Sequence, residues 1–176
     1  MREATALHLE GMEEDGLPIP EPSSVEDYLE MRLPGAEQVA ARCWQIEEFL
    51  DELLRREPEA LHFQLLPEYV AIHAHCHTKA LTNPAYMHRL MMRLSDRKVT
   101  FMNTGCCGMA GGFGMLESKY DLSVEVAKPL VEKIHSLPYG SLVVAAGASC
   151  RQQITHLTRV RPRHIVEVLA EALLAP

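Results

Sequence analysis

No stretch of the chain approaches the roughly 20 consecutive apolar residues that a membrane-spanning helix needs. The N-terminus, Met1-Arg2-Glu3-Ala4, leads into acidic residues and lacks the apolar centre of a secretory signal. Cysteine is scarce: the five present are an odd number and include an adjacent pair, which suits a secreted disulfide framework poorly. We therefore expect no membrane span and a cytoplasmic, reducing location.

Basic charge is also sparse. Residues 1–60 contain 16 acidic and 5 basic side chains, whereas residues 61–176 contain 8 and 12. This division is typical of an acidic, solvent-exposed head on a nearly balanced domain. The one basic cluster, Arg159, Arg161 and Arg163, is small and has no aromatic residues interleaved with it, so we expect no nucleic-acid partner.

The 176 residues, 47% of them hydrophobic, allow one domain with an appended segment. Residues 1–35 are acidic and rich in Pro and Gly, and we predict that they have no independent fold. We place the domain at residues 36–176. It opens with a predicted helix over residues 36–56, whose apolar stripe includes Cys43, and this position favours a core role for that cysteine.

After residue 60 the pattern alternates between strand and helix. Apolar runs at 69–75, 99–103 and 142–147 predict buried strands. Helices are expected after Asn83-Pro84, around residues 123–136, after Arg151 and over residues 164–174. Alternation of this kind predicts an α/β fold, a three-layer α/β/α arrangement with a small parallel sheet.

The cysteines fall at equivalent places in this pattern. Cys76, the Cys106–Cys107 pair and Cys150 each follow the carboxyl end of a predicted strand, and those ends share one edge of a parallel sheet. Four thiols at one edge predict metal or cluster ligation rather than four unrelated core cysteines. Thiolates prefer zinc, copper(I) or iron–sulfur clusters, and an adjacent pair is suited to bridging two irons.

Histidines surround the first of these thiols. His77 lies beside Cys76 and is a candidate ligand or hydrogen-bond donor to a ligand, whereas His73 and His75 suit structural roles better. A Cys76–His nucleophile is the rival chemistry that the residues leave open. The glycine-rich stretch at 108–114 contains neither a Walker lysine nor a dinucleotide-binding pattern, so no phosphate loop is assigned to it.

Three stretches carry a family resemblance: residues 75–81 (HCHTKAL), 104–114 (TGCCGMAGGFG) and 149–154 (SCRQQI). They resemble the cysteine-rich CCG domain found at the C-terminal end of FAD-linked oxidases and of iron–sulfur oxidoreductases like the glycolate oxidase iron–sulfur subunit. The resemblance implies a metal- or cluster-binding module that transfers electrons for a flavin-linked 2-hydroxyacid oxidoreductase of the glycolate or lactate type. It implies a 4Fe–4S cluster or zinc, with these ligands: Cys76, Cys106, Cys107 and Cys150.

The match departs from the family pattern in three ways. Gln153 stands where the fullest pattern has a further cysteine, only one of two tandem copies is present, and the flavin domain is absent. FAD is therefore expected on a partner domain or subunit, and the chain is not expected to be catalytic alone. The alternative is a non-enzymatic, zinc-stabilised interaction module.

A second, shorter resemblance involves the N-terminal segment. Residues 7–16 (LHLEGMEEDG) and 18–24 (PIPEPSS) are similar to the helix and following loop of HicB-type antitoxins. The strands that would complete that fold are missing, so no antitoxin activity is assigned.

Overall fold

A computed structural model describes residues 38–39, 41–66, 68–95 and 98–174. The chain divides into two compact units, Met1–Cys43 and Trp44–Pro176, and the sheet with the helices around it belongs to the second. The predicted unfolded segment at 1–35 and the HicB-like stretches within it lie outside the described residues.

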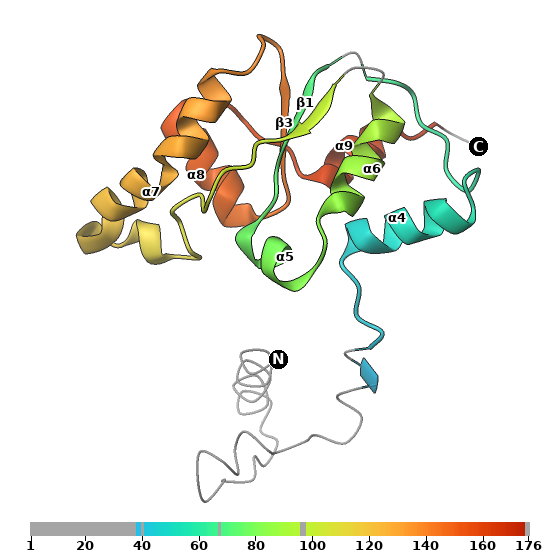
Figure 1. Cartoon of the computed structure of the whole chain (residues 1–176), viewed down its shortest axis with the longest axis horizontal. Coiled ribbons are helices and arrows are strands. Elements are labelled where there is room, and N and C mark those ends of the chain that lie inside the picture. Colours follow the sequence, from blue (N-terminus) through green and yellow to red (C-terminus); the bar gives the residue numbers. More distant parts are fainter. Residues whose placement is uncertain (1–37, 40, 67, 96–97, 175–176) are drawn as a thin grey trace, which may run out of the picture. The chain divides into compact units, whose positions relative to one another are not determined.

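A three-stranded parallel sheet forms the centre of the second unit (Figure 1). Its strands are β1 (Val70–His73), β2 (Val99–Phe101) and β3 (Leu142–Ala145), in the spatial order β2-β1-β3. Since β1 is central and the chain passes first to one side and then to the other, the fold has a switch point at its carboxyl end. In open parallel sheets, ligands bind at such a point.

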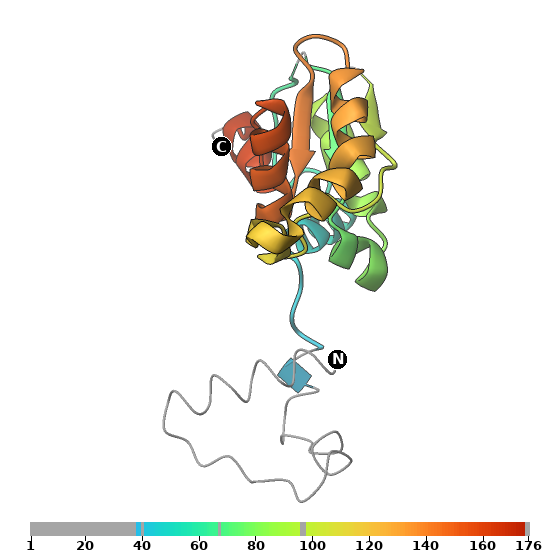
Figure 2. The ribbon, with the colours of Figure 1, turned by 90° about the vertical axis from the view of Figure 1, so that its left-hand side faces the viewer.

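Helices cover both faces of the sheet, as Figures 1 and 2 show. One face is covered by α4 (Ile46–Arg56), α6 (Ala85–Leu94) and α9 (Ile165–Ala172), and the other by α7 (Glu117–His135) and α8 (Ala148–Thr158). The predicted α/β class, with a small parallel sheet between two helical layers, is confirmed.

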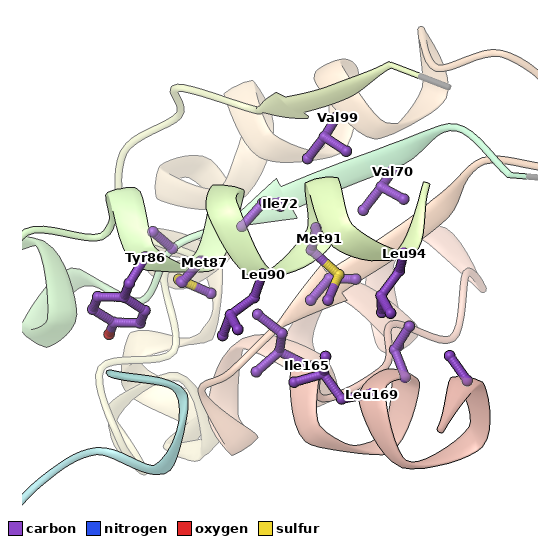
Figure 3. Close-up of a cluster of buried hydrophobic side chains, with 14 of the residues drawn as sticks. Val70, Ile72, Tyr86, Met87, Leu90, Met91, Leu94, Val99, Ile165 and Leu169 are labelled. Atoms are coloured by element: carbon purple, nitrogen blue, oxygen red, sulfur yellow. The ribbon is translucent and has the colours of Figure 1, made fainter. Parts of the chain in front are cut away.

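The larger core lies beneath α6 (Figure 3). Proline precedes the first helical residue, and the Asn83 side-chain oxygen accepts a hydrogen bond from the amide of Ala85 at 3.0 Å, so the helix begins where the sequence predicts. One face of α6 then packs onto β1 and α9. Its fully or nearly fully buried residues are Tyr86, Met87, Leu90, Met91 and Leu94.

The helix predicted over 36–56 is shorter in the structure. α4 begins at Ile46, because Gln45 has an extended backbone (φ −68°, ψ 139°). The apolar stripe therefore does not continue back through Cys43, and the prediction that Cys43 is a core residue is wrong: it is exposed. Ile46, on the predicted stripe, is also half exposed.

The inward face of α4 contains two buried carboxylates, those of Glu47 and Asp51. Asp51 is buried and accepts hydrogen bonds from Arg89 of α6, at 3.0 Å from Nε and 2.5 Å from Nη2. Arg93 of the same helix donates to the carbonyl of Leu54 at 2.7 Å. A buried carboxylate is stable only when it is paired, so α4 depends on α6 for more than apolar contact.

Replacing Arg89 with methionine is expected to lower the free energy of unfolding by about 2 kcal/mol. The variant leaves the Asp51 carboxylate buried without its partner, although the exposure of Arg89 itself keeps the loss below that of a fully buried pair. The control is Arg55→Met, which breaks an exposed pair with Glu52 and should cost less than about 0.5 kcal/mol. Denaturant unfolding of both variants measures the two losses, and equal losses would contradict a special role for Arg89.

Two helical elements near the sheet edge differ from the sequence prediction. α7 begins at Glu117 rather than near residue 123, and Pro129 lies inside it without ending it. The short helix α5 (Cys76–Leu81) directly follows β1 and was not predicted. Among the helices in the described ranges, none has both the length and the apolarity that a bilayer crossing requires.

Candidate metal centre

Cys76 is placed by the end of β1. The strand residues Val70–His73 are all buried, and shortly after them Cys76 starts α5. Its side chain is partly exposed. The short helix thus holds the first thiol at the carboxyl edge of the central strand.

The adjacent pair lies on the loop that follows β2. Lys79, one helical turn after Cys76, donates from Nζ to the carbonyl oxygens of Thr104 at 3.0 Å and Gly105 at 3.4 Å. These contacts tie the loop just before Cys106 to the helix that carries Cys76. Cys106 is partly exposed and Cys107 is buried.

Cys150 comes from the first turn of α8, immediately after β3, and is buried. Gly147 makes this approach possible. A Cβ at that position would lie 2.6 Å from Cδ2 of His75 and 3.1 Å from Sγ of Cys150, closer than side chains tolerate. The ends of β1 and β3 therefore come together because residue 147 has no side chain.

The four thiols interact as one group. The pKa of Cys107 responds to Cys150 and Cys106, and the pKa values of Cys106 and Cys150 each respond to Cys76. The amide of Gly108 donates to Sγ of Cys106 at 3.3 Å. The structure thus brings all four sequence-predicted cysteines together, from three strand ends.

The group favours a thiolate at one position. The hydrogen bond from Cys150 lowers the pKa of Cys107 to about 6 and, with help from the amide of Met109, outweighs burial, which acts in the opposite direction. The same hydrogen bond, together with burial, raises the pKa of Cys150. Burial also raises the pKa of Cys106, partly offset by the amide of Gly108. Cys107 therefore ionises first.

In the reduced, metal-free protein, one thiolate is expected to form as the pH rises through about 6, below the ordinary cysteine value of 9.0. Because the folded-state pKa is the lower one, ionised Cys107 stabilises the fold in full above pH 9, and this contribution is lost as the pH falls through 6. Ultraviolet thiolate absorbance measures the step. It should vanish in Cys107→Ser and persist in Cys43→Ser, and its survival in Cys107→Ser would show that another thiol ionises.

The donor set fits a soft metal or an iron–sulfur cluster. Four thiols are available, and backbone N–H groups already point at two of the sulfurs, an arrangement that stabilises negative charge on sulfur ligands. Within the described residues, no three His, Cys, Asp or Glu side chains are spaced as the coordination shell of a single ion. The thiols instead influence one another's pKa values.

A second contact supports the cysteine loop, the stretch of residues 104–114 that carries Cys106 and Cys107. Gln153, buried on α8, donates from Nε2 to the Ser123 hydroxyl of α7 at 2.9 Å. Ser123 in turn lies directly against Gly108 and Gly114 of the loop. Gln153 thus holds the surface of α7 on which the loop rests.

The histidines occupy different positions. His77 is exposed, and its ring meets that of His75 edge-on, with centroids 5.1 Å apart. His73 is buried, and burial is the main cause that lowers its pKa to about 4. Its Nδ1 lies 3.4 Å from the Thr104 hydroxyl, while its Nε2 has no hydrogen-bond partner among the described residues. His164 precedes α9, and its Nε2 lies 3.4 Å from Glu47 of α4, so it takes part in the contact between α9 and α4.

Sequence reasoning missed the supporting residues. Lys79 follows Cys76 by one helical turn. This spacing indicates a shared helix face only if the segment is helical, and α5 was not predicted. The contact between Ser123 and Gln153 joins residues 30 positions apart and has no local signal.

The site is therefore of a defined class: a group of four thiols at the carboxyl edge of a small parallel α/β sheet. The chain is similar to a subunit of the anaerobic glycerol-3-phosphate dehydrogenase of Escherichia coli strain K12, and equally to that of strain O157:H7, at 30% identity over 117 residues. The match covers 66% of this chain and 29% of the length of each relative. No family model matches the chain, and no solved structure matches it. The chain thus shares sequence with one part of a dehydrogenase subunit.

Proposed function

We propose that this chain is an electron-transfer module that binds an iron–sulfur cluster of the 4Fe–4S type. The ligands are Cys76, Cys106, Cys107 and Cys150, with exposed His77 as a further candidate. The observation that carries the proposal is the group of four interacting thiols at one sheet edge. When bound, such a cluster supplies one-electron chemistry. The resemblance to the CCG domain, assigned to residues 36–176, agrees with this interpretation.

The partner in this proposal is a flavin-containing subunit or domain that oxidises the substrate and passes electrons to this chain. The relatives support a dehydrogenase complex, since their name describes a dehydrogenase subunit. The substrate is a small alcohol: a 2-hydroxyacid by the CCG resemblance, or glycerol 3-phosphate by the relatives. Five free thiols favour the reducing cytoplasm as the location.

A zinc-stabilised interaction module is the second candidate. Gln153 leaves four cysteines, which is a complete set for tetrahedral zinc. In this case the thiols hold the ends of β1, β2 and β3 together and no electron passes through the site. The adjacent Cys106–Cys107 pair favours the cluster, because a single zinc ion seldom needs it.

Metal and sulfide analysis of the full chain, prepared without oxygen, tests the proposal. We expect roughly four iron and four acid-labile sulfide per chain, with a visible absorption that bleaches on reduction. Zinc without acid-labile sulfide would contradict the cluster and support the zinc-stabilised module instead. A chain without metal, in which all four thiols react freely with an alkylating agent, would exclude both.

Lys79→Met is expected to weaken metal retention by about tenfold while changing the melting temperature little. The variant releases the carbonyls of Thr104 and Gly105, so the loop that carries Cys106 is no longer tied to α5. Lys133→Met is the matched control, because it removes the same charge from an exposed site on α7. Retention is measured as the rate of iron or zinc loss to a chelator. Equal rates in both variants would contradict a positioning role for Lys79.

A further inference from the structure

A cavity of about 770 Å³ lies between α8, the segment that leads into α9, and α9 itself. No cysteine is among the residues that line it, so it is distinct from the thiol group. The charged and titratable side chains around it are Arg151, His156, Arg161, Arg163, Glu167 and Glu171. Its size is within the range of small-molecule sites.

The segment that contributes two of the arginines is fixed against the sheet. The amide of Arg163 donates to the carbonyl of Val143 at 2.9 Å, and the amide of Ala145 donates to the carbonyl of Arg163 at 3.0 Å. These bonds extend the β3 edge, so the backbone beside Arg161 has a defined position. Two members of the arginine cluster that was too small for nucleic acid, Arg161 and Arg163, therefore line a wall of this cavity.

Arg151 lines another wall of the cavity, on α8, and hydrogen bonds hold its guanidinium. Its Nη1 donates to the carbonyl oxygens of Ala145 at 3.0 Å and Ala146 at 2.5 Å, at the end of β3. These bonds fix the guanidinium plane and leave the donors on Nε and Nη2 for another partner. A guanidinium held in this way loses little side-chain freedom when it binds an anion.

The acidic residues do not neutralise the cavity. Glu171 forms a two-pronged pair with Arg163, and Glu167 accepts from the backbone amide of His164 at 2.8 Å. Arg161 is exposed and has no hydrogen bond or ion pair with any residue in the described ranges. Three arginines face two glutamates, so the lining is net positive, and neither Arg151 nor Arg161 has a carboxylate partner among the described residues.

We propose that this cavity binds the phosphate group of a small molecule. Two guanidinium groups from different elements present separate forks of donors, and a tetrahedral phosphate has enough oxygens to accept from both. A carboxylate has two oxygens in one plane and fills one fork. This inference does not depend on the thiol group holding a metal.

Inorganic phosphate is the probe for the full chain, titrated by calorimetry at constant ionic strength. We expect saturable binding that weakens about tenfold in Arg161→Gln, a variant that breaks no contact of the fold. Arg159→Gln is the control, since Arg159 is exposed, lies close by in the sequence and does not line the cavity. Its affinity should stay within about twofold of the parent chain.

Three results would overturn the proposal. A binding heat that does not saturate and is equal in all three proteins would mean that phosphate acts only through its general effect on protein surfaces. Acetate that binds as tightly as phosphate would assign the cavity to carboxylates. Loss of affinity in Arg159→Gln equal to that in Arg161→Gln would mean that only net charge matters.

Discussion

Cys107→Ser is expected to abolish retention of metal and sulfide. The neighbouring thiols Cys150 and Cys106 help lower the pKa of Cys107 to about 6, so it is the first to supply a thiolate. Serine keeps the size of the side chain but offers a hard oxygen that ionises far less readily. The metal content of protein prepared without oxygen measures the loss.

Two other thiols of the group and one cysteine outside it set the pattern of the result. Cys76→Ser and Cys150→Ser should also lose the metal, because each supplies the sulfur from one strand end. Cys43→Ser should retain it, since Cys43 is exposed and outside the group. If Cys107→Ser bound as much metal as Cys43→Ser, the thiol group would not be the metal site, and reactivity of Cys76 with its neighbouring histidines would become the leading interpretation.

The convergence of the thiols was predictable from sequence for a simple physical reason. Parallel strands end at one edge, so three buried apolar runs, each followed by cysteine, place their cysteines together without knowledge of any contact. Glycine at 147 completes the arrangement by allowing the strand ends to approach, and the sequence alone does not reveal that demand.

The less predictable parts depend on distant partners. The periodicity that extended the first helix back to residue 36 treated Cys43 as an inward position, whereas the inward face of α4 contains Asp51. That carboxylate is stable there because Arg89, 38 residues away, pairs with it. A local pattern shows polarity but not the partner that makes burial of a polar group acceptable. The early start of α7 was missed for a related reason: residues 115–122 are all exposed, so they show no buried stripe.

Gly108→Ala is expected to destabilise the fold by about 3 kcal/mol and to disorder the cysteine loop. Gly108 has a φ of +86°, and a Cβ there would lie 2.0 Å from the backbone carbonyl oxygen of Ser123. Backbone atoms of α7 cannot yield as a side-chain end does, so the loop must move away from the helix. The thiols of Cys106 and Cys107, which precede this glycine, would then lose their positions. Denaturant unfolding and metal retention measure the two consequences.

Gly111→Ala separates the energetic cost of the steric clash from the cost of the positive-φ backbone conformation. Gly111 also has a positive φ, +69°, but a Cβ there would meet nothing within 4 Å. We expect it to cost about 1 kcal/mol from conformation alone and to leave metal retention unchanged. Gly112→Ala, with no contact within 4 Å and no positive φ, should be nearly neutral. Equal losses in Gly108→Ala and Gly111→Ala would mean that the loop does not rest against Ser123. A loss of metal retention confined to Gly108→Ala would establish that the close approach of the loop to α7 holds the thiol group in place.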